Sequence, residues 1–234
     1  MIKIQDLQKR FGKFVALENI NIEIEKGKIT SIIGPNGSGK TTLIKSILGL
    51  VIPTKGKIYI DGVDIKKNYN YREKIGYMPQ IANFPENVTV REFFSMMQDI
   101  RNKKNEKKLS ELIEILDLTP HLNKKIKNLS GGTKQKVNAI LSLMFNPDIL
   151  IFDEPTVGLD PVTAIKLKKI ISKEKEEGKT IIFVSHIVNE IESLADNIVF
   201  MVEGKLTFAG TIIDLKEKTQ RESLEDAIIC LLNS

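Results

Sequence analysis

The sequence predicts an α/β fold with a mainly parallel sheet, a small antiparallel sheet at the N-terminal end and a helical insertion in the middle. Three apolar runs rich in β-branched residues predict buried strands at 28–33, 149–154 and 180–186. Helical patterns separate these runs, and strands that alternate with helices favour a parallel sheet. Ligands of such sheets bind outside the carboxyl ends of the strands, so the residues that end these runs are candidates for a site.

A glycine-rich stretch follows the first of these runs. Residues 34–41 match G-x-x-x-x-G-K-[ST], and the apolar spacing of 42–49 predicts a helix directly after it. Backbone N–H groups in such a loop surround phosphate oxygens, and the positive helix end favours the anion. Lys40 is then expected to reach the β- and γ-phosphates and the Thr41 hydroxyl to hold Mg²⁺. We predict a nucleoside triphosphate site formed by Gly34, Pro35, Asn36, Gly37, Ser38, Gly39, Lys40, Thr41 and Thr42.

Length and composition exclude several classes of protein. The 234 residues are 41% hydrophobic and 28% charged, and we expect one globular domain over 1–234. The single Cys230 excludes an internal disulfide framework. No uncharged apolar run approaches the roughly 18 residues that span a bilayer, and the first residues lack the apolar segment of a signal peptide. We therefore expect a cytoplasmic protein that reaches the inner face of the cell membrane only through a partner.

The net charge of +5 comes largely from lysine, with much of it in local runs such as 101–108. A solvated helix face and a contact with anionic lipid or nucleic acid are both compatible with such a run. Acidic residues are interleaved throughout, which favours the solvated face. We expect no nucleic-acid partner.

Several weaker patterns complete the chain. Apolar residues at period two within 1–26 and 57–62 predict a small antiparallel sheet. A further strand over 75–80 ends at Gln80. Residues 197–210 predict a hairpin, and the last helix is expected to bury Leu224, Ala227, Ile228 and Leu231.

Residues 84–145 predict a helical subdomain, because apolar positions recur there at helical spacing. These positions are Val90, Phe93, Phe94 and Met97, then Leu109, Leu112, Ile113 and Leu116, then Val137, Ile140, Leu141 and Met144. The last of these helices follows the stretch 129–133, which contains Gly131 and Gly132. Two glycines just ahead of a helix again offer N–H groups to an anion.

The two later strands end in residues suited to catalysis. The run 149–154 ends in Asp153 and Glu154, and acids at the end of a buried strand are costly unless they bind metal or polarise water. The run 180–186 ends in His186. All three side chains should meet the phosphate loop at one edge of the sheet.

With these motifs in place, the chain resembles the ATP-binding subunit of ABC transporters over essentially all 234 residues. The resemblance implies a P-loop (RecA-like) core that carries the antiparallel and helical subdomains. The family's motifs occur here in the family's order: an aromatic at Phe11, Walker A at 34–41, Gln80 in a Q-loop, the signature 129–133, Walker B at 149–154, the D-loop 158–160 and the switch His186.

The resemblance also implies a head-to-tail dimer, most simply a homodimer, with each ATP held between the Walker A loop of one subunit and the signature of the other. Phosphoryl transfer depends on positioning and charge stabilisation, so some group must meet the γ-phosphate from the open side. No arginine occurs between Arg101 and Arg221 to act as an arginine finger. Ser130, Gly131 and Gly132 of the second subunit are expected to take that place.

Residue roles follow from the same resemblance. Glu154 is expected to polarise the attacking water as general base. Asp153, Gln80 and Thr41 are expected to hold Mg²⁺, with Gln80 also near the water. His186 is expected to contact the γ-phosphate.

Further positions come with this resemblance. Phe11 is expected to stack on adenine, and Asp160 to contact the other subunit. Thr133 replaces the family's usual glutamine and Lys136 its usual arginine, which should alter tuning without abolishing ATP binding. Phe84, in the apolar stretch after Gln80, is expected either to dock a separately encoded transmembrane permease or to be buried locally.

Two questions remain open at this level. Residues 71–87 and 129–138 resemble the copper/sulfur-processing (NosF) type of transporter ATPase that is associated with nitrous oxide reductase maturation, whereas small-substrate export is the broader expectation. The alternative function is an ABC-type ATPase without transport, for example in iron–sulfur assembly. A GTPase is disfavoured because no Asn-Lys-x-Asp motif occurs, and a kinase would need neither the signature nor the D-loop.

Overall fold

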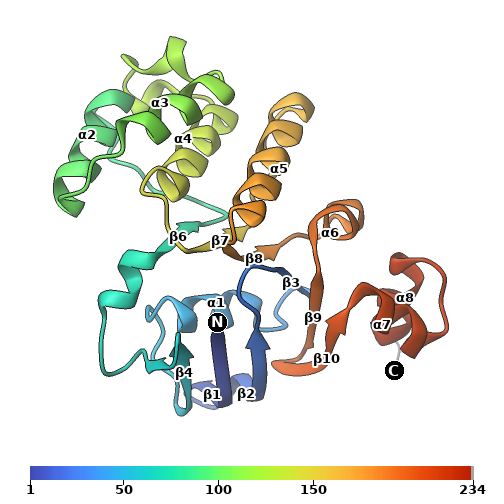
Figure 1. Cartoon of the computed structure of the whole chain (residues 1–234). Helices are drawn as coiled ribbons and strands as arrows, with labels where there is room; N and C mark the ends of the chain where they lie inside the picture. Colours follow the sequence, from blue (N-terminus) through green and yellow to red (C-terminus); the bar gives the residue numbers. More distant parts are fainter. Residues whose placement is uncertain (233–234) are drawn as a thin grey trace.

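The computed structural model describes residues 1–232 and contains two sheets (Figure 1). Residues of both sheets share one hydrophobic cluster. The smaller sheet is antiparallel in the order β2-β1-β4-β5 and confirms the predicted N-terminal subdomain. Its buried isoleucines and leucines alternate with exposed side chains, because only one face of this sheet covers the core. Its strands are β1 (Ile2–Phe11), β2 (Phe14–Ile24), β4 (Lys55–Ile60) and β5 (Val63–Asp64).

The larger sheet has the order β10-β9-β3-β8-β7-β6, with every neighbouring pair parallel except the β9–β10 hairpin. It confirms the predicted α/β class. Its three central strands are buried at every residue, which explains why their sequences are continuous apolar runs. The strands are β3 (Ile29–Ile33), β6 (Ile75–Met78), β7 (Ile149–Asp153), β8 (Thr180–Val184), β9 (Asn197–Val202) and β10 (Lys205–Thr211).

Helices connect and cover the larger sheet. They are α1 (Lys40–Ile47), α5 (Pro161–Glu176), α6 (Val188–Leu194), α7 (Ile212–Thr219) and α8 (Leu224–Leu232). Helix α7 was not among the expected helices, although Thr211 and Asp214 form a reciprocal capping box at its start. In α8 the predicted face is buried at Leu224, Ala227 and Leu231, whereas Ile228 is partly buried. No helix within residues 1–232 combines the length and the apolar character that a membrane crossing needs.

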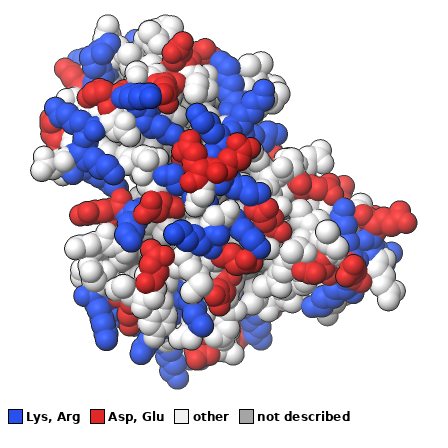
Figure 2. Space-filling model, in the orientation of Figure 1, with Lys and Arg blue, Asp and Glu red and all other residues white. Residues whose placement is uncertain are grey.

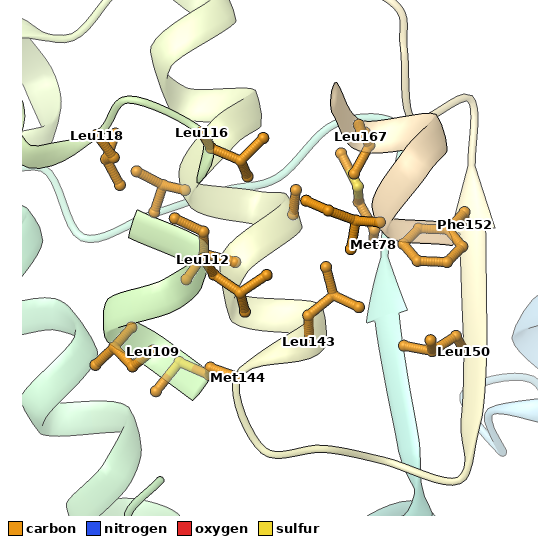
Figure 3. Packing of buried hydrophobic residues seen from close by; sticks show 14 of the residues in the cluster. Met78, Leu109, Leu112, Leu116, Leu118, Leu143, Met144, Leu150, Phe152 and Leu167 are labelled. Atoms are coloured by element: carbon orange, nitrogen blue, oxygen red, sulfur yellow. The ribbon is translucent and has the colours of Figure 1, made fainter. Parts of the chain in front are cut away.

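The segment predicted to be helical contains α2 (Val90–Arg101), α3 (Glu106–Ile115) and α4 (Gly131–Leu143), with short 3-10 turns between α3 and α4. These helices share one hydrophobic cluster with β6, β7 and α5, as Figure 3 shows for Leu112, Leu143, Met78 and Leu167. The predicted apolar stripes supply this cluster. The helical part therefore packs on the sheet rather than standing apart from it.

Charged side chains cover the surface in mixed patches. Figure 2 shows Lys and Arg interleaved with Asp and Glu over the face seen in Figure 1. His121 is half-buried, with Nδ1 lacking a hydrogen-bond partner. Burial lowers its pKa, and the positive charge of Lys124 adds to the shift.

Candidate functional site

A cavity of about 270 Å³ lies at the carboxyl ends of β3, β7 and β8. The phosphate loop, Asp153, Glu154 and His186 meet there, as the strand pattern predicted, and Gln80 after β6 also lines the cavity. The lining residues are Phe14, Ala16, Asn36, Gly37, Ser38, Gly39, Lys40, Thr41, Thr42, Gln80, Asp153, Glu154, Val184 and His186. Gly34 and Pro35 lie just behind this lining and contact Lys40.

The phosphate loop adopts a conformation that only glycine accommodates at two points. Gly34 has φ 147°, and a Cβ added there would lie 2.0 Å from the Met201 carbonyl oxygen. Gly39 has φ 100°, and its Cβ would lie 2.6 Å from the Ala16 carbonyl oxygen. Gly39 is also the N-cap of α1, and no side chain caps this helix. The first N–H groups of α1 are therefore available to an anion in the cavity.

Lys40 lies within this loop and is only 8% exposed. Its Nζ donates to the carbonyl oxygens of Gly34 at 2.7 Å and Pro35 at 2.9 Å. Burial lowers the pKa of Lys40, and the charges of Glu154 and Asp153 oppose that shift. The ammonium group is thus held at the loop by its own backbone, within the cavity where a phosphate would lie.

Asp153 ends β7 and Glu154 follows it in the left-handed region, with φ 52°. The Glu154 N–H donates to the Val184 carbonyl oxygen at 2.9 Å, which fixes this strained residue against the end of β8. Burial raises the pKa of both carboxyl groups, with opposing contributions from His186 and Lys40. Burial also raises the pKa of Tyr77 on the neighbouring strand to about 12, and the charge of Asp153 adds to that shift.

Glu154 and His186 contact each other directly. The Glu154 Oε1 and His186 Nε2 atoms are 3.2 Å apart, and the His186 backbone N–H donates to Oε2 at 3.4 Å. Despite the short distance, Oε1 has no aligned hydrogen bond and is buried. Within residues 1–232 this oxygen is therefore an acceptor that remains available to a water or substrate group.

Two buried amides that the sequence analysis did not single out connect α4 to this site. The Asn138 side chain donates to the Pro79 carbonyl oxygen at 2.8 Å, directly before the exposed Gln80. The Gln135 side chain donates to the Pro155 carbonyl oxygen at 3.4 Å, directly after Glu154. The two amides also bond to each other. The helix that begins at the signature thus supports two loops of the cavity.

The signature itself lies away from the cavity lining. Ser130 caps α4 by accepting a hydrogen bond from the Thr133 N–H at 3.3 Å. Ser130 and Gly131 are exposed, and a Cβ added at Gly131 would meet nothing within 4 Å. Gly132 is tighter, because its Cβ would lie 2.9 Å from the Gly158 carbonyl oxygen. The D-loop Asp160 caps α5, and its bonds to Thr163 lower its pKa.

Two aromatic residues lie at the turn between β1 and β2. Phe14 lines the cavity, whereas Phe11 is not among the lining residues. The two pair across the turn between β1 and β2, and the Lys9 ammonium lies 4.7 Å above the Phe11 ring. Both rings are exposed.

The chemistry of the lining is compatible with Mg²⁺. Thr41, Gln80 and Asp153 offer oxygen donors to one cavity, and Mg²⁺ prefers oxygen ligands while keeping several waters. Residues 1–232 contain no group of three or more His, Cys, Asp or Glu side chains that could hold a metal. A metal here would rest on this mixed oxygen set and on the phosphates of the nucleotide.

Comparison with known proteins places this arrangement in a family. The family model described as ABC transporter matches residues 17–157. The lantibiotic transport ATP-binding protein SrtF of Streptococcus pyogenes is 37% identical, covering 97% of this chain and 95% of SrtF. The bacitracin transport ATP-binding protein BcrA of Bacillus licheniformis is 35% identical, over 94% of this chain and 73% of BcrA.

Longer relatives and solved structures agree. The probable multidrug ABC transporter ATP-binding protein YbhF of Escherichia coli is 34% identical over the whole chain, which spans 42% of YbhF. An ATP-binding subunit of an ABC transporter superposes with a TM-score of 0.92 at 27% identity, covering 99% of both chains. The dimeric cassette MJ0796 bound to ADP and Pi superposes with a TM-score of 0.82 at 29% identity, covering 90% of this chain and 98% of that one. The chain belongs to the ABC transporter family and is one of its ATP-binding, ATP-hydrolysing subunits.

Proposed function

We propose that this ATPase powers the export of a small or peptide substrate through a separately encoded transmembrane permease, working as a head-to-tail homodimer at the inner face of the membrane. The observation that carries the proposal is the divided site. The cavity holds the phosphate loop, Asp153, Glu154 and His186, whereas Gly131 lies exposed outside it. The names of SrtF, BcrA and YbhF, which refer to lantibiotic transport, bacitracin transport and a probable multidrug transporter, support a peptide or drug-like substrate.

Within each site, Glu154 is proposed as the general base, because its buried and unbonded Oε1 can accept a proton from a water. Lys40 and the uncapped start of α1 are proposed to bind the phosphates, and His186 to bind the γ-phosphate. Thr41, Gln80 and Asp153 are proposed to hold Mg²⁺, which would neutralise phosphate charge. Phe11, with Phe14 beside it, is proposed to stack on adenine.

The second subunit is proposed to close the site with Ser130, Gly131 and Gly132. The similarity to the dimeric MJ0796 cassette supports this arrangement. The exposed glycine at the start of α4 would bring unhindered N–H groups to the γ-phosphate of the other subunit. The whole chain, with its helical part at about 84–145, is proposed to act as one ATP-binding domain.

The permease is proposed to dock in a groove of about 250 Å³ between the sheet and the helical part. Its apolar lining includes Leu50, Tyr77 and Met97, with two guanidinium groups beside them at Arg72 and Arg101. A groove with apolar walls and a charged rim suits a short amphipathic segment of a partner.

Ile81 is proposed to contact the permease in place of Phe84, for which local burial was the alternative expectation. Phe84 is partly buried, and its ring packs edge-on against Phe93 with centroids 5.5 Å apart. Ile81 follows Gln80 directly and is 79% exposed. Ile81→Asp should therefore weaken permease binding without unfolding the chain, whereas Phe84→Asp should also lower the melting temperature.

Co-expression with a membrane protein encoded beside this chain tests the proposed function. Proteoliposomes with the purified complex should transport bacitracin, a lantibiotic or a drug in an ATP-dependent manner, and the substrate should stimulate ATP hydrolysis. Stimulation by copper or sulfur species instead would favour the narrower copper/sulfur-processing resemblance of residues 71–87. If no membrane protein co-purifies and ATPase activity responds only to soluble partners, the non-transport alternative holds.

A further inference from the structure

Glu190 is a buried acid that takes no part in lining the nucleotide cavity. It lies in the first turn of α6 and is 4% exposed. Its Oε2 accepts hydrogen bonds from the Thr156 hydroxyl at 3.1 Å and from the Ser185 hydroxyl at 2.9 Å. Both donors are buried as well. A carboxyl group is costly to bury, so its partners indicate what it is there to hold.

Those partners flank the two residues that contact each other in the cavity. Thr156 lies two positions after Glu154, and Ser185 lies directly before His186. The Ser185 hydroxyl also accepts from the Ile187 N–H at 3.1 Å, so the hydroxyl ties the turn that carries His186. A single oxygen of Glu190 therefore joins the loop after β7 to the loop after β8.

The position of Glu154 depends on that junction. Its backbone is in the left-handed region, a conformation that persists only where the surroundings hold it. The two residues that follow Glu154 are both attached, because the Gln135 amide donates to the Pro155 carbonyl oxygen and the Thr156 hydroxyl donates to Glu190. The Glu154 and His186 side chains are 3.2 Å apart, and each of the two loops that carry them has a hydroxyl bonded to Glu190.

We propose that Glu190 is a positioning residue for ATP hydrolysis, which holds the loops of Glu154 and His186 at a fixed separation. This inference rests on the proposed role of Glu154 as general base. Two hydroxyl donors on one oxygen, together with the positive start of α6, satisfy an acceptor at this point. Glu190 acts only through these neighbours and does not touch the nucleotide.

The test compares Glu190→Ala and Glu190→Gln with a control, Glu174→Gln. Glu174 is a similarly buried acid, 1% exposed, that pairs with Lys108 far from the cavity lining. Glu190→Ala should lower kcat at least ~10-fold, since small misplacements of catalytic groups are costly. Nucleotide affinity should change less than ~2-fold, because the phosphate loop is untouched. Glu190→Gln keeps an acceptor oxygen and should restore most of kcat. Glu174→Gln should alter the melting temperature but not kcat.

Two further measurements keep the outcome decisive. In the Glu154→Gln background, Glu190→Ala should reduce hydrolysis no further, because the group that it positions is already lost. If Glu190→Ala does not fold, Ser185→Ala and Thr156→Val replace it, and each should lower kcat. Wild-type kcat in a folded Glu190→Ala chain, or in both replacement variants, overturns the proposal. Near-normal turnover in Glu154→Gln alone would instead overturn the role of Glu154.

Discussion

Two helices of this chain begin at glycine-rich loops, and they differ in what surrounds those glycines. At α1, Gly34 and Gly39 are enclosed, with added Cβ atoms only 2.0 Å and 2.6 Å from backbone oxygens. At α4, Gly131 faces open space, and the Ser130 side chain caps the helix. The chain's own packing requires glycine at the first loop but not at Gly131. The requirement at Gly131, if there is one, must come from another molecule.

The largest effect is expected on the α1 side of this comparison. Glu154→Gln should lower kcat at least ~100-fold while keeping nucleotide affinity, because it removes the proposed general base. The variant should also accumulate as an ATP-bound dimer on size-exclusion chromatography. Glu174→Gln serves as the control for loss of a buried acid, and near-normal turnover in Glu154→Gln would contradict the assignment.

Mixing variants tests whether the two helix starts complete one site. Lys40→Ala and Gly131→Asp chains should each be inactive alone, since every site in either homodimer lacks one half. After equal mixing and random exchange, half of the dimers carry one intact site, so about a quarter of wild-type activity should return. Steady-state ATPase assays over a range of mixing ratios measure this. Activity of the Gly131→Asp chain alone, linear in concentration, would show that one subunit suffices.

The free energy of unfolding should respond differently to substitution at Gly34 and at Gly131. Gly34→Ala places a methyl group against the Met201 carbonyl and should cost at least ~2 kcal/mol of unfolding free energy. Gly131→Ala should leave that free energy within ~1 kcal/mol of wild type or raise it, since alanine favours helices. Urea denaturation of the nucleotide-free chains gives both values. A destabilised Gly131→Ala chain would mean that packing within the subunit explains this glycine.

The adenine side of the cavity should show smaller effects. Phe11→Ala is expected to weaken ATP binding up to ~10-fold, the scale of one strong aromatic contact of about 1.4 kcal/mol. Phe14→Ala should weaken it to a similar or lesser extent, because Phe14 lines the cavity. Titration with a fluorescent ATP analogue measures both. Normal affinity in Phe11→Ala with reduced affinity in Phe14→Ala would assign the stacking to Phe14.

The smallest expected effect concerns pH. Burial raises the pKa of Asp153 and Glu154 in the folded chain, so between the unfolded and folded pKa values the folded state binds more protons. These acids therefore reduce stability at neutral pH, and the loss is relieved as pH falls through the folded pKa. Glu154→Gln should raise the melting temperature of the nucleotide-free chain at pH 7, by ~2–4 °C for each kcal/mol of unfolding free energy that is gained. This gain in melting temperature should shrink in acid. A gain that is independent of pH would contradict this origin.

The sequence predicted those site residues that lie within or directly after a recognisable local motif. The phosphate loop, Asp153, Glu154 and His186 each follow a buried strand, and parallel strands bring their carboxyl ends to one edge. Gln135, Asn138 and Glu190 could not be recognised in this way. Their partners lie 20, 59 and 34 residues away, and a polar residue on a helix is usually solvated. The position of Phe14 in the cavity depended on the turn geometry of a hairpin, which periodicity does not determine.

The two amides on α4 have a mechanical consequence. The helix of 13 residues is about 20 Å long and stiff, and its exposed end carries Gly131. About one turn further on, Gln135 donates to the Pro155 carbonyl oxygen, and after about two turns Asn138 donates to the Pro79 carbonyl oxygen. A displacement of the exposed end of α4 would therefore move the loops at Pro79 and Pro155 together. We therefore expect contact with a neighbouring molecule at Gly131 to shift Gln80 and Glu154 together.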